Sequence, residues 1–166
     1  MKTSPSSSIK KKKKEKLIIG TLDKADFPEW GLQEIDCKID TGAQTSAIHC
    51  HGVKVIEKKG REVLIFKLLD PTHPAYNHKP FEYTEFKERI VKNSFGESEE
   101  RYVIRAKILL FGQLIETEFT LADRMKMKYP ILLGKKLLRG RFLVDVAKKN
   151  LSWKAKNKMQ DIRHKT

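Results

Sequence analysis

The 166-residue sequence lacks the features that mark several classes of protein. Its only cysteines are Cys37 and Cys50, too few for the disulfide framework of a small secreted domain. No apolar run is long enough to cross a bilayer, and the lysine-rich start lacks the apolar core of a secretory signal. These absences favour a cytoplasmic protein in a reducing compartment, with no membrane partner.

Nucleotide and metal motifs are also scarce. There is no Gly-x-x-x-x-Gly-Lys-Ser/Thr phosphate loop to support ATP binding. His49, Cys50 and His51 are adjacent, but alternate residues of a strand face opposite ways, so they offer two metal ligands at best. Neither His-Glu-x-x-His nor Cys-x-x-Cys accompanies them, although His73 and His78 could complete a site. We expect no metal and no cofactor, with solvated histidines and a half-buried Cys50.

Positive charge is abundant, and it lies at the two ends of a chain whose net charge is +14. Residues 1–16 hold seven Lys and one Glu, and residues 135–166 hold 11 Lys and Arg against two acidic residues. Residues 17–134 are near neutral, with 17 basic and 18 acidic residues. Basic ends on a neutral body suit an acidic partner such as nucleic acid, the ribosome or an acidic peptide. Simple solubilising ends are the alternative.

The length leaves room for one domain with a real core. Residues 1–16 are almost entirely Ser and Lys, which predicts a disordered tail because they cannot bury enough apolar surface. Residues 17–153 are expected to form the domain. Residues 154–166 are polar and cationic, and we expect them to fray as a basic C-terminal tail.

Hydrophobic alternation predicts a mainly β domain. Strands are expected over residues 17–22, 35–39, 52–57, 62–68, 81–91, 101–110, 114–121, 131–133 and 142–146, with a short one over 150–153. A short helix is expected over 135–139, between Gly134 and Gly140. Trp30 is expected to pack in the core.

The loop that follows the strand at residues 35–39 is the main candidate for chemistry. Asp40 ends this strand, and Thr41 and Gly42 follow at once. Glycine lets another backbone approach closely, so the carboxylate lies on a tight bend. A carboxylate held there is either a turn-former or a catalyst.

The order of two motifs resembles one half of a retropepsin. Asp40-Thr41-Gly42-Ala43 follows an apolar strand, and Ile131-Leu132-Leu133-Gly134 comes later, just before the short helix. The segments 40–48, 119–124, 129–134 and 138–145 are further similar to a bacterial retropepsin-like family. Members of that family are often labelled ATP-dependent zinc proteases and are linked to RimK-type glutamate ligases. The resemblance covers roughly residues 18–153.

The resemblance implies a closed β-barrel that forms a C2 homodimer, with Asp40 of each copy in a shared catalytic site. Aspartic peptidases need two carboxylates that share one proton, and this chain has a single Asp-Thr-Gly. In the family, Thr41 would hydrogen-bond across the two-fold axis, Gly42 would leave room for substrate and partner, and Ala43 would line the loop. The strand Ile131 to Gly134 would pack beneath it.

A mobile hairpin is expected to cover such a site. The turn Asn93-Ser94-Phe95-Gly96-Glu97 joins two charged strands and is our candidate flap, although a plain surface hairpin would have the same composition. The hairpin over residues 52–68 lengthens the chain relative to a compact viral retropepsin. Which hairpin covers the cleft is therefore left open.

The sequence leaves two functions open. The first is a homodimeric aspartic peptidase that acts on a peptide or protein, acidic in character, such as a glutamyl tail on a ribosomal protein. The second is a non-catalytic retropepsin-shaped module that binds nucleic acid or ribosomes nonspecifically through its basic ends. The sequence shows no recognition helix or aromatic-basic platform that would make such binding specific.

Overall fold

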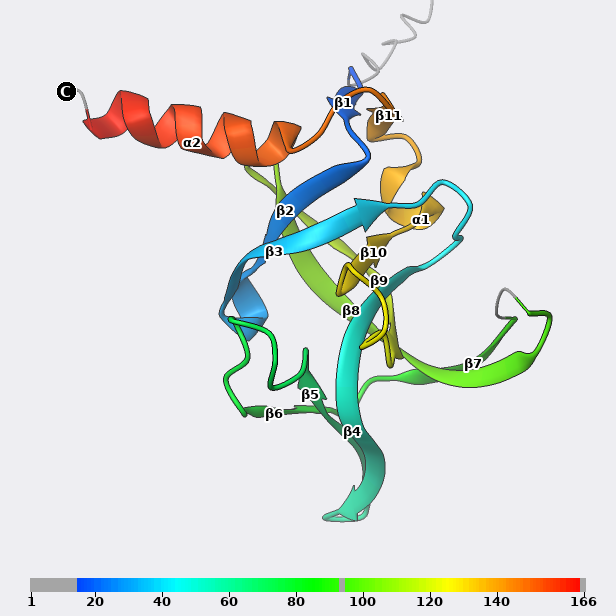
Figure 1. Cartoon of the computed structure of the whole chain (residues 1–166). Coiled ribbons are helices and arrows are strands. Elements are labelled where there is room, and N and C mark those ends of the chain that lie inside the picture. The colour runs from blue at the N-terminus through cyan, green and yellow to red at the C-terminus, as the bar shows by residue number, and fades with distance from the viewer. Residues whose placement is uncertain (1–14, 93–94, 165–166) are drawn as a thin grey trace, which may run out of the picture.

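The computed structural model describes residues 15–92 and 95–164, and strands dominate it (Figure 1). The elements are β1 Leu17–Ile19, β2 Leu22–Phe27, the 3-10 helix η1 Pro28–Trp30, β3 Leu32–Ile39, β4 Ser46–Lys58, β5 Arg61–Leu68, β6 Pro80–Tyr83, β7 Lys87–Lys92, β8 Ser98–Leu110, β9 Gln113–Ala122, β10 Ile131–Leu133, α1 Lys135–Leu138, β11 Phe142–Val144 and α2 Leu151–His164. The predicted mainly β class is confirmed, and so is the short helix that follows Gly134.

Strands in the described part of the chain close into a barrel. The neighbours run in the order β10-β3-β2-β8-β9-β4, and β4 pairs back with β10. β10 is parallel to β3, with Ile131 opposite Cys37 and Leu133 opposite Ile39, and it is antiparallel to β4. This closed order confirms the predicted retropepsin-like barrel. The short β10 completes the ring between the strands that flank the Asp40 loop.

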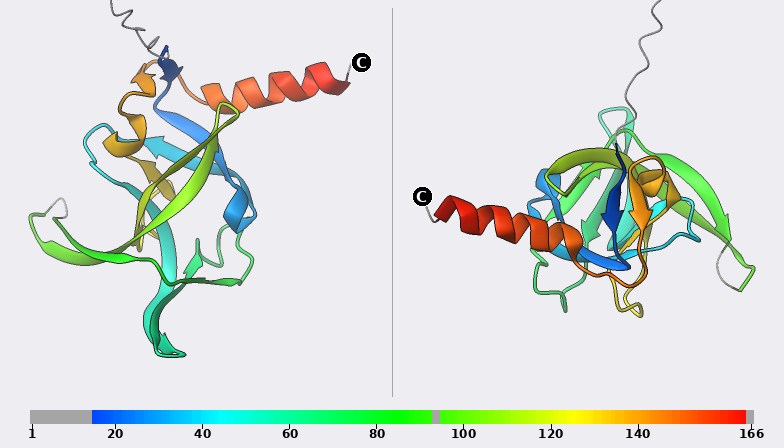
Figure 2. Two further views of the ribbon diagram at one scale, coloured as in Figure 1. Left: turned by 180° about the vertical axis from the view of Figure 1, so that it is seen from behind. Right: turned by 90° about the horizontal axis from the view of Figure 1, so that it is seen from above.

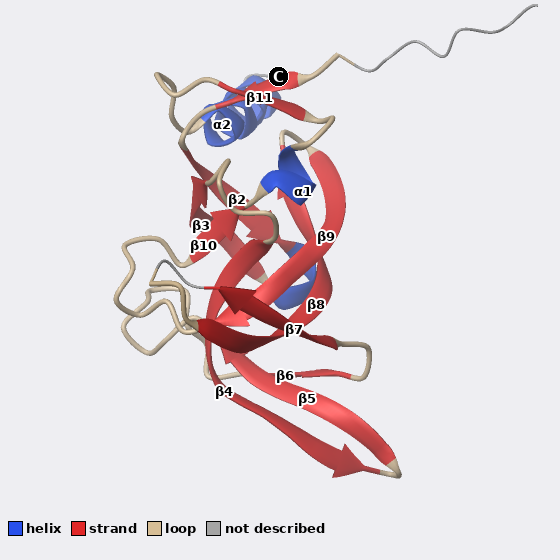
Figure 3. Ribbon diagram, turned by 90° about the vertical axis from the view of Figure 1, so that its right-hand side faces the viewer, coloured by secondary structure: helices blue, strands red, loops and turns tan. Residues whose placement is uncertain are grey.

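Two hairpins extend from the barrel. β4 and β5 form the predicted hairpin, and its turn at Lys59 and Gly60 has positive φ at both residues (53° and 75°). Such a turn matches the natural twist of paired strands. β7 and β8 form the second hairpin, which curves away from the body in a different direction in Figure 1 and faces the viewer in Figure 3.

The prediction of one continuous strand over residues 81–91 is wrong. β6 pairs with β5, placing Phe81 opposite Phe66, whereas β7 pairs with β8. The chain breaks at residues 84–86 to pass from one partner to the other. Alternation along the sequence could not reveal this break because both halves have strand-like patterns.

The core is apolar and contains an aromatic cluster. Trp30 is buried, stacks on Phe27 with ring centroids 5.2 Å apart and meets the edge of Phe119. Its indole Nε1–H donates to the Tyr83 hydroxyl at 2.8 Å. The prediction that Trp30 packs in the core is confirmed.

The C-terminal region differs from its prediction. We expected a strand over residues 150–153 and a frayed tail from residue 154, but Leu151–His164 forms α2, which projects from the barrel (Figure 2). The buried Asp23 on β2 accepts the first N–H groups of this helix, at 2.9 Å from Ser152 and 3.1 Å from Trp153. A carboxylate at a helix N-terminus accepts hydrogen bonds from N–H groups that have no partner within the helix, and its negative charge interacts favourably with the helix dipole. The cap lies 129 residues from Ser152 in sequence, so local pattern could not predict it.

β1 and β11 form a separate two-stranded parallel sheet at the same end of the molecule as α1 (Figure 1). Ile18 and Leu143 are directly paired in it, and their side chains are 51% and 56% exposed. This small sheet therefore presents an apolar face.

Two further predictions meet the limits of the described chain. Residues 1–14 of the predicted tail, and Asn93 and Ser94 of the candidate flap, lie outside the described residues. Within residues 15–92 and 95–164, neither helix has the length and apolar character needed to cross a membrane.

Candidate active site

Asp40 stands at the end of β3, where the alternation of buried Ile35, Cys37 and Ile39 delivers it to the surface half-exposed. Its backbone N–H donates to the Leu133 carbonyl of β10 at 2.8 Å. The position of Asp40 is therefore fixed by the barrel and not by the loop alone.

The Asp40 loop, residues 40–45, folds back onto the carboxylate. Oδ1 of Asp40 accepts the backbone N–H groups of Gly42 at 2.8 Å and Ala43 at 3.2 Å. Among the described residues, these hydrogen bonds both fall on Oδ1, which leaves Oδ2 without a hydrogen-bond partner. Thr41 and Gly42 are exposed. Asp40 thus forms the turn that we considered as its structural role, and it keeps one oxygen available for chemistry.

The second motif lies directly against this loop. The backbone N–H groups of Lys135 and Lys136, at the start of α1, donate to the carbonyls of Ala43 (2.7 Å) and Gln44 (3.0 Å). The loop therefore caps the helix. Gly134 precedes α1, and a Cβ on it would lie 2.8 Å from the Ala43 carbonyl oxygen and 2.9 Å from that of Thr45. The structure brings together both predicted motifs, with glycine required for the close contact.

The candidate flap hairpin projects on the same side of the molecule as the Asp40 loop (Figures 1 and 2). Of its tip, Phe95, Gly96 and Glu97 are described and exposed, and Phe95 is 90% exposed. That the tip closes over the site stays a prediction.

A polar contact that the sequence did not predict joins this hairpin to the Asp40 loop. Arg89 on β7 donates to Thr45 Oγ1 at 3.2 Å through Nη1 and to Glu118 of β9 at 3.0 Å through Nη2. Glu118 also accepts from Lys136 Nζ at 3.1 Å. Burial raises the pKa of the Glu118 carboxyl. The hydrogen bonds and positive charges of Lys136 and Arg89 together lower it by more, so this pKa lies below its usual value. Glu118 therefore joins the flap strand to α1, and Arg89 joins the flap strand to the Asp40 loop.

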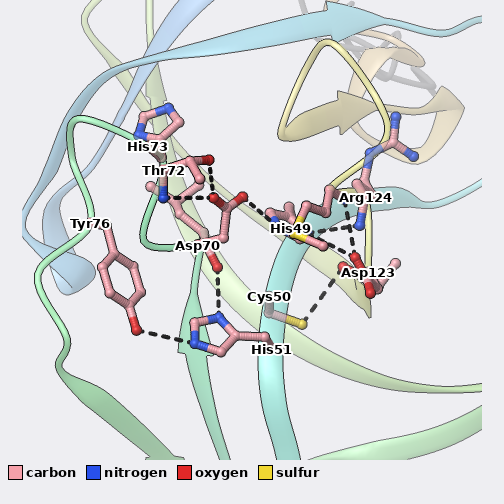
Figure 4. Close-up of polar contacts among 12 residues, drawn as sticks. His49, Cys50, His51, Asp70, Thr72, His73, Tyr76, Asp123 and Arg124 are labelled. Atoms are coloured by element: carbon pink, nitrogen blue, oxygen red, sulfur yellow. Dashed lines mark hydrogen bonds and ion pairs between the residues drawn. The ribbon is translucent and has the colours of Figure 1, made fainter.

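A second polar group surrounds His49 (Figure 4). His49 is buried, its Nδ1 accepts the Arg124 backbone N–H at 2.7 Å, and its Nε2 lies 2.8 Å from Asp70 Oδ2. With Nδ1 as an acceptor, Nε2 carries the proton and donates to Asp70. The Thr72 hydroxyl also donates to Asp70, and it is the main cause that lowers the pKa of this carboxyl. The expectation of a solvated His49 is wrong, because the ring is buried and Asp70, 21 residues away in sequence, supplies its hydrogen-bond partner.

Arg124 lies in the loop that follows β9. Its Nε donates to the Tyr129 carbonyl at 3.4 Å. Burial lowers the pKa of the Arg124 guanidinium, the charge of Arg101 lowers it further, and the charge of Asp40 raises it. Arg124 is therefore within electrostatic reach of Asp40, which no motif in the sequence indicated.

The candidate metal ligands are engaged elsewhere. His51 Nδ1 donates to the Leu69 carbonyl at 2.8 Å and its Nε2 accepts from the Tyr76 hydroxyl at 3.1 Å. Cys50 points instead toward the Ala122 carbonyl on β9, and burial raises the pKa of its thiol to about 12 (Figure 4). In the described ranges, no three or more His, Cys, Asp or Glu side chains are grouped so that they could hold a metal ion.

Known proteins are similar to this chain in sequence. A family model described as "Retropepsin-like aspartic endopeptidase RimB" (RimB-like) matches residues 18–155. A probable alpha-L-glutamate ligase of Shewanella pealeana is 37% identical over 134 residues, and one of Desulfotalea psychrophila is 33% identical over 136. These matches cover 78% and 80% of this chain but 28% of each relative, so the chain spans little more than a quarter of their length.

The fold is also present in a crystal structure of a Legionella pneumophila protein of unknown function. The two share 26% sequence identity with a TM-score of 0.66, over 83% of this chain and 99% of that one. The predicted retropepsin-like resemblance is confirmed, whereas the zinc protease label gains no support from these descriptions. With an intact family match over most of its length, the chain belongs to the RimB-like family of retropepsin-like aspartic endopeptidases.

Proposed function

We propose that the protein is a homodimeric aspartic peptidase in which Asp40 of each subunit contributes one carboxylate to a shared site. The observation that carries this proposal is the state of Asp40: β10 and the loop hold it in place, while Oδ2 has no hydrogen-bond partner in the described chain. The family description, an aspartic endopeptidase, supports the same chemistry.

The chemistry follows from two carboxylates placed side by side. Because like charges a few ångströms apart resist ionising together, the pair holds one proton and titrates as a unit. The ionised member takes a proton from water as the water oxygen attacks the peptide carbonyl carbon. The protonated member donates a hydrogen bond to the carbonyl oxygen, and a proton passes to the amine as the C–N bond breaks.

The second carboxylate would come from a second copy, since the sequence contains a single Asp-Thr-Gly. A C2 interface brings the same patch of two subunits together. The exposed Thr41 beside Asp40 could hydrogen-bond across such an axis. The apolar face of the β1–β11 sheet, with Ile18 and Leu143, would be covered in the same interface.

The substrate that best fits this family is a glutamyl chain. The relatives cited above are named probable alpha-L-glutamate ligases, and a ligase of that kind forms bonds that a peptidase can hydrolyse. We infer that this chain trims glutamyl residues from an acidic peptide or from the tail of a ribosomal protein.

Asp40→Asn tests the proposal. It keeps the shape of the side chain but removes the shared proton, so cleavage of a Glu-rich peptide should fall roughly a thousandfold. Asp36→Asn, an exposed carboxylate on the same strand, serves as the matched control. Light scattering should give a dimer mass for both variants, and a chelator should leave wild-type cleavage unchanged. Retention of cleavage by Asp40→Asn, with contaminating proteases excluded, would refute the mechanism.

A second candidate function is nonspecific binding of nucleic acid or ribosomes by the basic ends. The observation that favours it is α2, which presents the exposed Lys154 and Lys158 on a helix that stands away from the barrel (Figure 2). Replacing both lysines with Gln should weaken binding to an oligonucleotide and reduce its dependence on salt. Unchanged binding would exclude α2 as the contact. Both functions can coexist if the basic ends only localise an enzyme.

A further inference from the structure

Three arginines from different elements form what we call the arginine row: Arg89, Arg101 and Arg124, of which Arg89 contacts the Asp40 loop. Arg89 on β7 is directly opposite Arg101 on β8. Opposite residues of an antiparallel pair place their side chains on one face, so these two arginines share a face of the hairpin. Arg124 follows β9 and lies within electrostatic reach of both Arg101 and Asp40. The row therefore begins on the candidate flap, and its third member interacts electrostatically with the candidate catalytic carboxylate.

Arg89 identifies which face of the hairpin is turned toward the loop. Its Nη1 is 3.2 Å from the Thr45 hydroxyl, in the same loop that carries Asp40. A substrate chain lying between hairpin and loop would pass this arginine, whose side chain is 33% exposed. Because the row shares this face, Arg101 is directed to the same side.

Positive charge is in excess around Glu118, the carboxylate that Arg89 binds. Three cations surround the single carboxylate of Glu118: Arg89 at 3.0 Å, Lys136 at 3.1 Å and Lys87 at 3.7 Å. One carboxylate neutralises one of them. If Arg89 turned to another anion, the two lysines would still compensate Glu118.

Arg101 adds a donor that the described chain does not satisfy. Its Nη2 binds Glu99 at 3.1 Å, but its Nε–H is buried and has no hydrogen-bond partner among the described residues. An unpaired buried donor is costly, and native proteins rarely keep one without a reason. An acceptor that reached this side of the hairpin would remove that cost.

We propose that the arginine row is a specificity-determining surface that binds side-chain carboxylates of an acidic peptide, with Arg89 as the principal contact. The placement of the peptide rests on the proposed function of the Asp40 loop. The guanidinium fork matches a carboxylate with two parallel hydrogen bonds, whereas a neutral amide lacks the charge and one acceptor. Glu99 and Glu118 lie among the arginines, and this alternation suits separate carboxylates better than the continuous charge of a phosphate backbone.

The test measures discrimination and not activity alone. Two fluorescent peptides of equal length, one with central Glu residues and one with Gln in their place, are titrated into Asp40→Asn protein so that they remain intact. Arg89→Gln in this background should lower the affinity for the Glu peptide about tenfold, the expected effect of losing one hydrogen bond to a charged group. The Gln peptide should be nearly unaffected. Arg61→Gln, at the distant β4–β5 turn, removes the same charge and serves as the control.

Glu118→Gln should change the affinity for the Glu peptide in the opposite direction. It removes the carboxylate that competes for Arg89, so the Glu peptide should bind several-fold more tightly. If the Arg89–Glu118 contact only held the hairpin in place, both variants would weaken both peptides alike, and the proposal would be overturned. Circular dichroism of each variant verifies the fold before titration.

The remaining outcomes separate this proposal from the peptidase mechanism. Equal affinity of the parent protein for the two peptides would overturn the arginine row as a selector even if Asp40→Asn abolishes cleavage. Selectivity that depends on Arg89, with cleavage unaffected by Asp40→Asn, would uphold the row and refute the catalytic role. An oligonucleotide that displaces the Glu peptide, and loses affinity equally in Arg89→Gln, would reassign the row to phosphate and overturn an acidic peptide as its ligand.

Discussion

Asp23 and Asp40 lie near the same end of the antiparallel β2–β3 strand pair and show two uses of one side chain. Asp23 is buried and accepts three backbone N–H groups, from Lys24, Ser152 and Trp153. Asp40 is half-exposed and accepts two, both on the same oxygen. Both oxygens of the Asp23 carboxylate, which holds α2, therefore accept hydrogen bonds, whereas only one oxygen of Asp40 does. Incomplete hydrogen bonding beside exposed surface is what a reacting carboxylate requires.

The largest effect on stability should come from removing the saturated carboxylate. Asp23→Ala leaves helix N–H groups of α2 without an acceptor, so the free energy of unfolding should fall by about 3 kcal/mol. Asp40→Ala should cost less than about 1 kcal/mol, since water can reach the groups it frees. Urea unfolding followed by circular dichroism measures both. Equal losses would erase the distinction between the two carboxylates.

The support beneath Asp40 should be the next most sensitive. Gly134→Ala forces a methyl group against the carbonyl oxygens of Ala43 and Thr45, which should lower the free energy of unfolding by about 2 kcal/mol. The displaced loop should also slow cleavage per folded molecule. Lys135→Ala, at the adjacent residue, is the control. A fully stable and active Gly134→Ala would show that the loop adapts and that the close contact is not required.

The smallest effect concerns pH. The folded-state pKa of Glu118 is lowered, so its contacts with Arg89 and Lys136 stabilise the fold above the ordinary carboxyl pKa of about 4.5 and lose this effect as pH falls through the lowered value. The stability advantage of wild type over Glu118→Gln should therefore be present near neutral pH and shrink in acid. Chemical unfolding at several pH values measures it, with Glu116→Gln, an exposed carboxylate on the same strand, as control. A constant difference would mean that Glu118 acts through its shape and not its charge.

The Asp40 loop and β10 were predictable because each is encoded by a short, contiguous motif. The alternation before Asp40, the glycine after it and the run Ile131 to Gly134 are all local, and a barrel strand requires nothing more. The contacts of Arg89 were not predictable in this way. Thr45 lies 44 residues from Arg89 in sequence, and Glu118 lies 29 residues away. From sequence alone, a charged residue on a strand is predicted to face solvent, because its neighbours in space are unknown.

The C-terminal helix illustrates the same limit. Lys154 and Lys158 resemble a solvated tail in sequence, and the apolar pattern of α2 is weak. Its start depends on the buried Asp23, and Lys156 is held by Asp26 at 2.9 Å. Both partners come from β2, at the other end of the chain. Tertiary contacts can stabilise a helix whose own sequence has little preference for one.

By itself, the sequence determined the β class, the order of the two retropepsin-like motifs and the identity of Asp40 as the residue to test, since hydrophobic alternation and turn chemistry act over a few neighbouring residues. Only the tertiary structure decided which carboxylates are saturated, that His49 is buried against Asp70, and that Arg89 contacts the Asp40 loop and lies opposite Arg101. These properties depend on distances between strands that the chain brings together only when the barrel closes through β10.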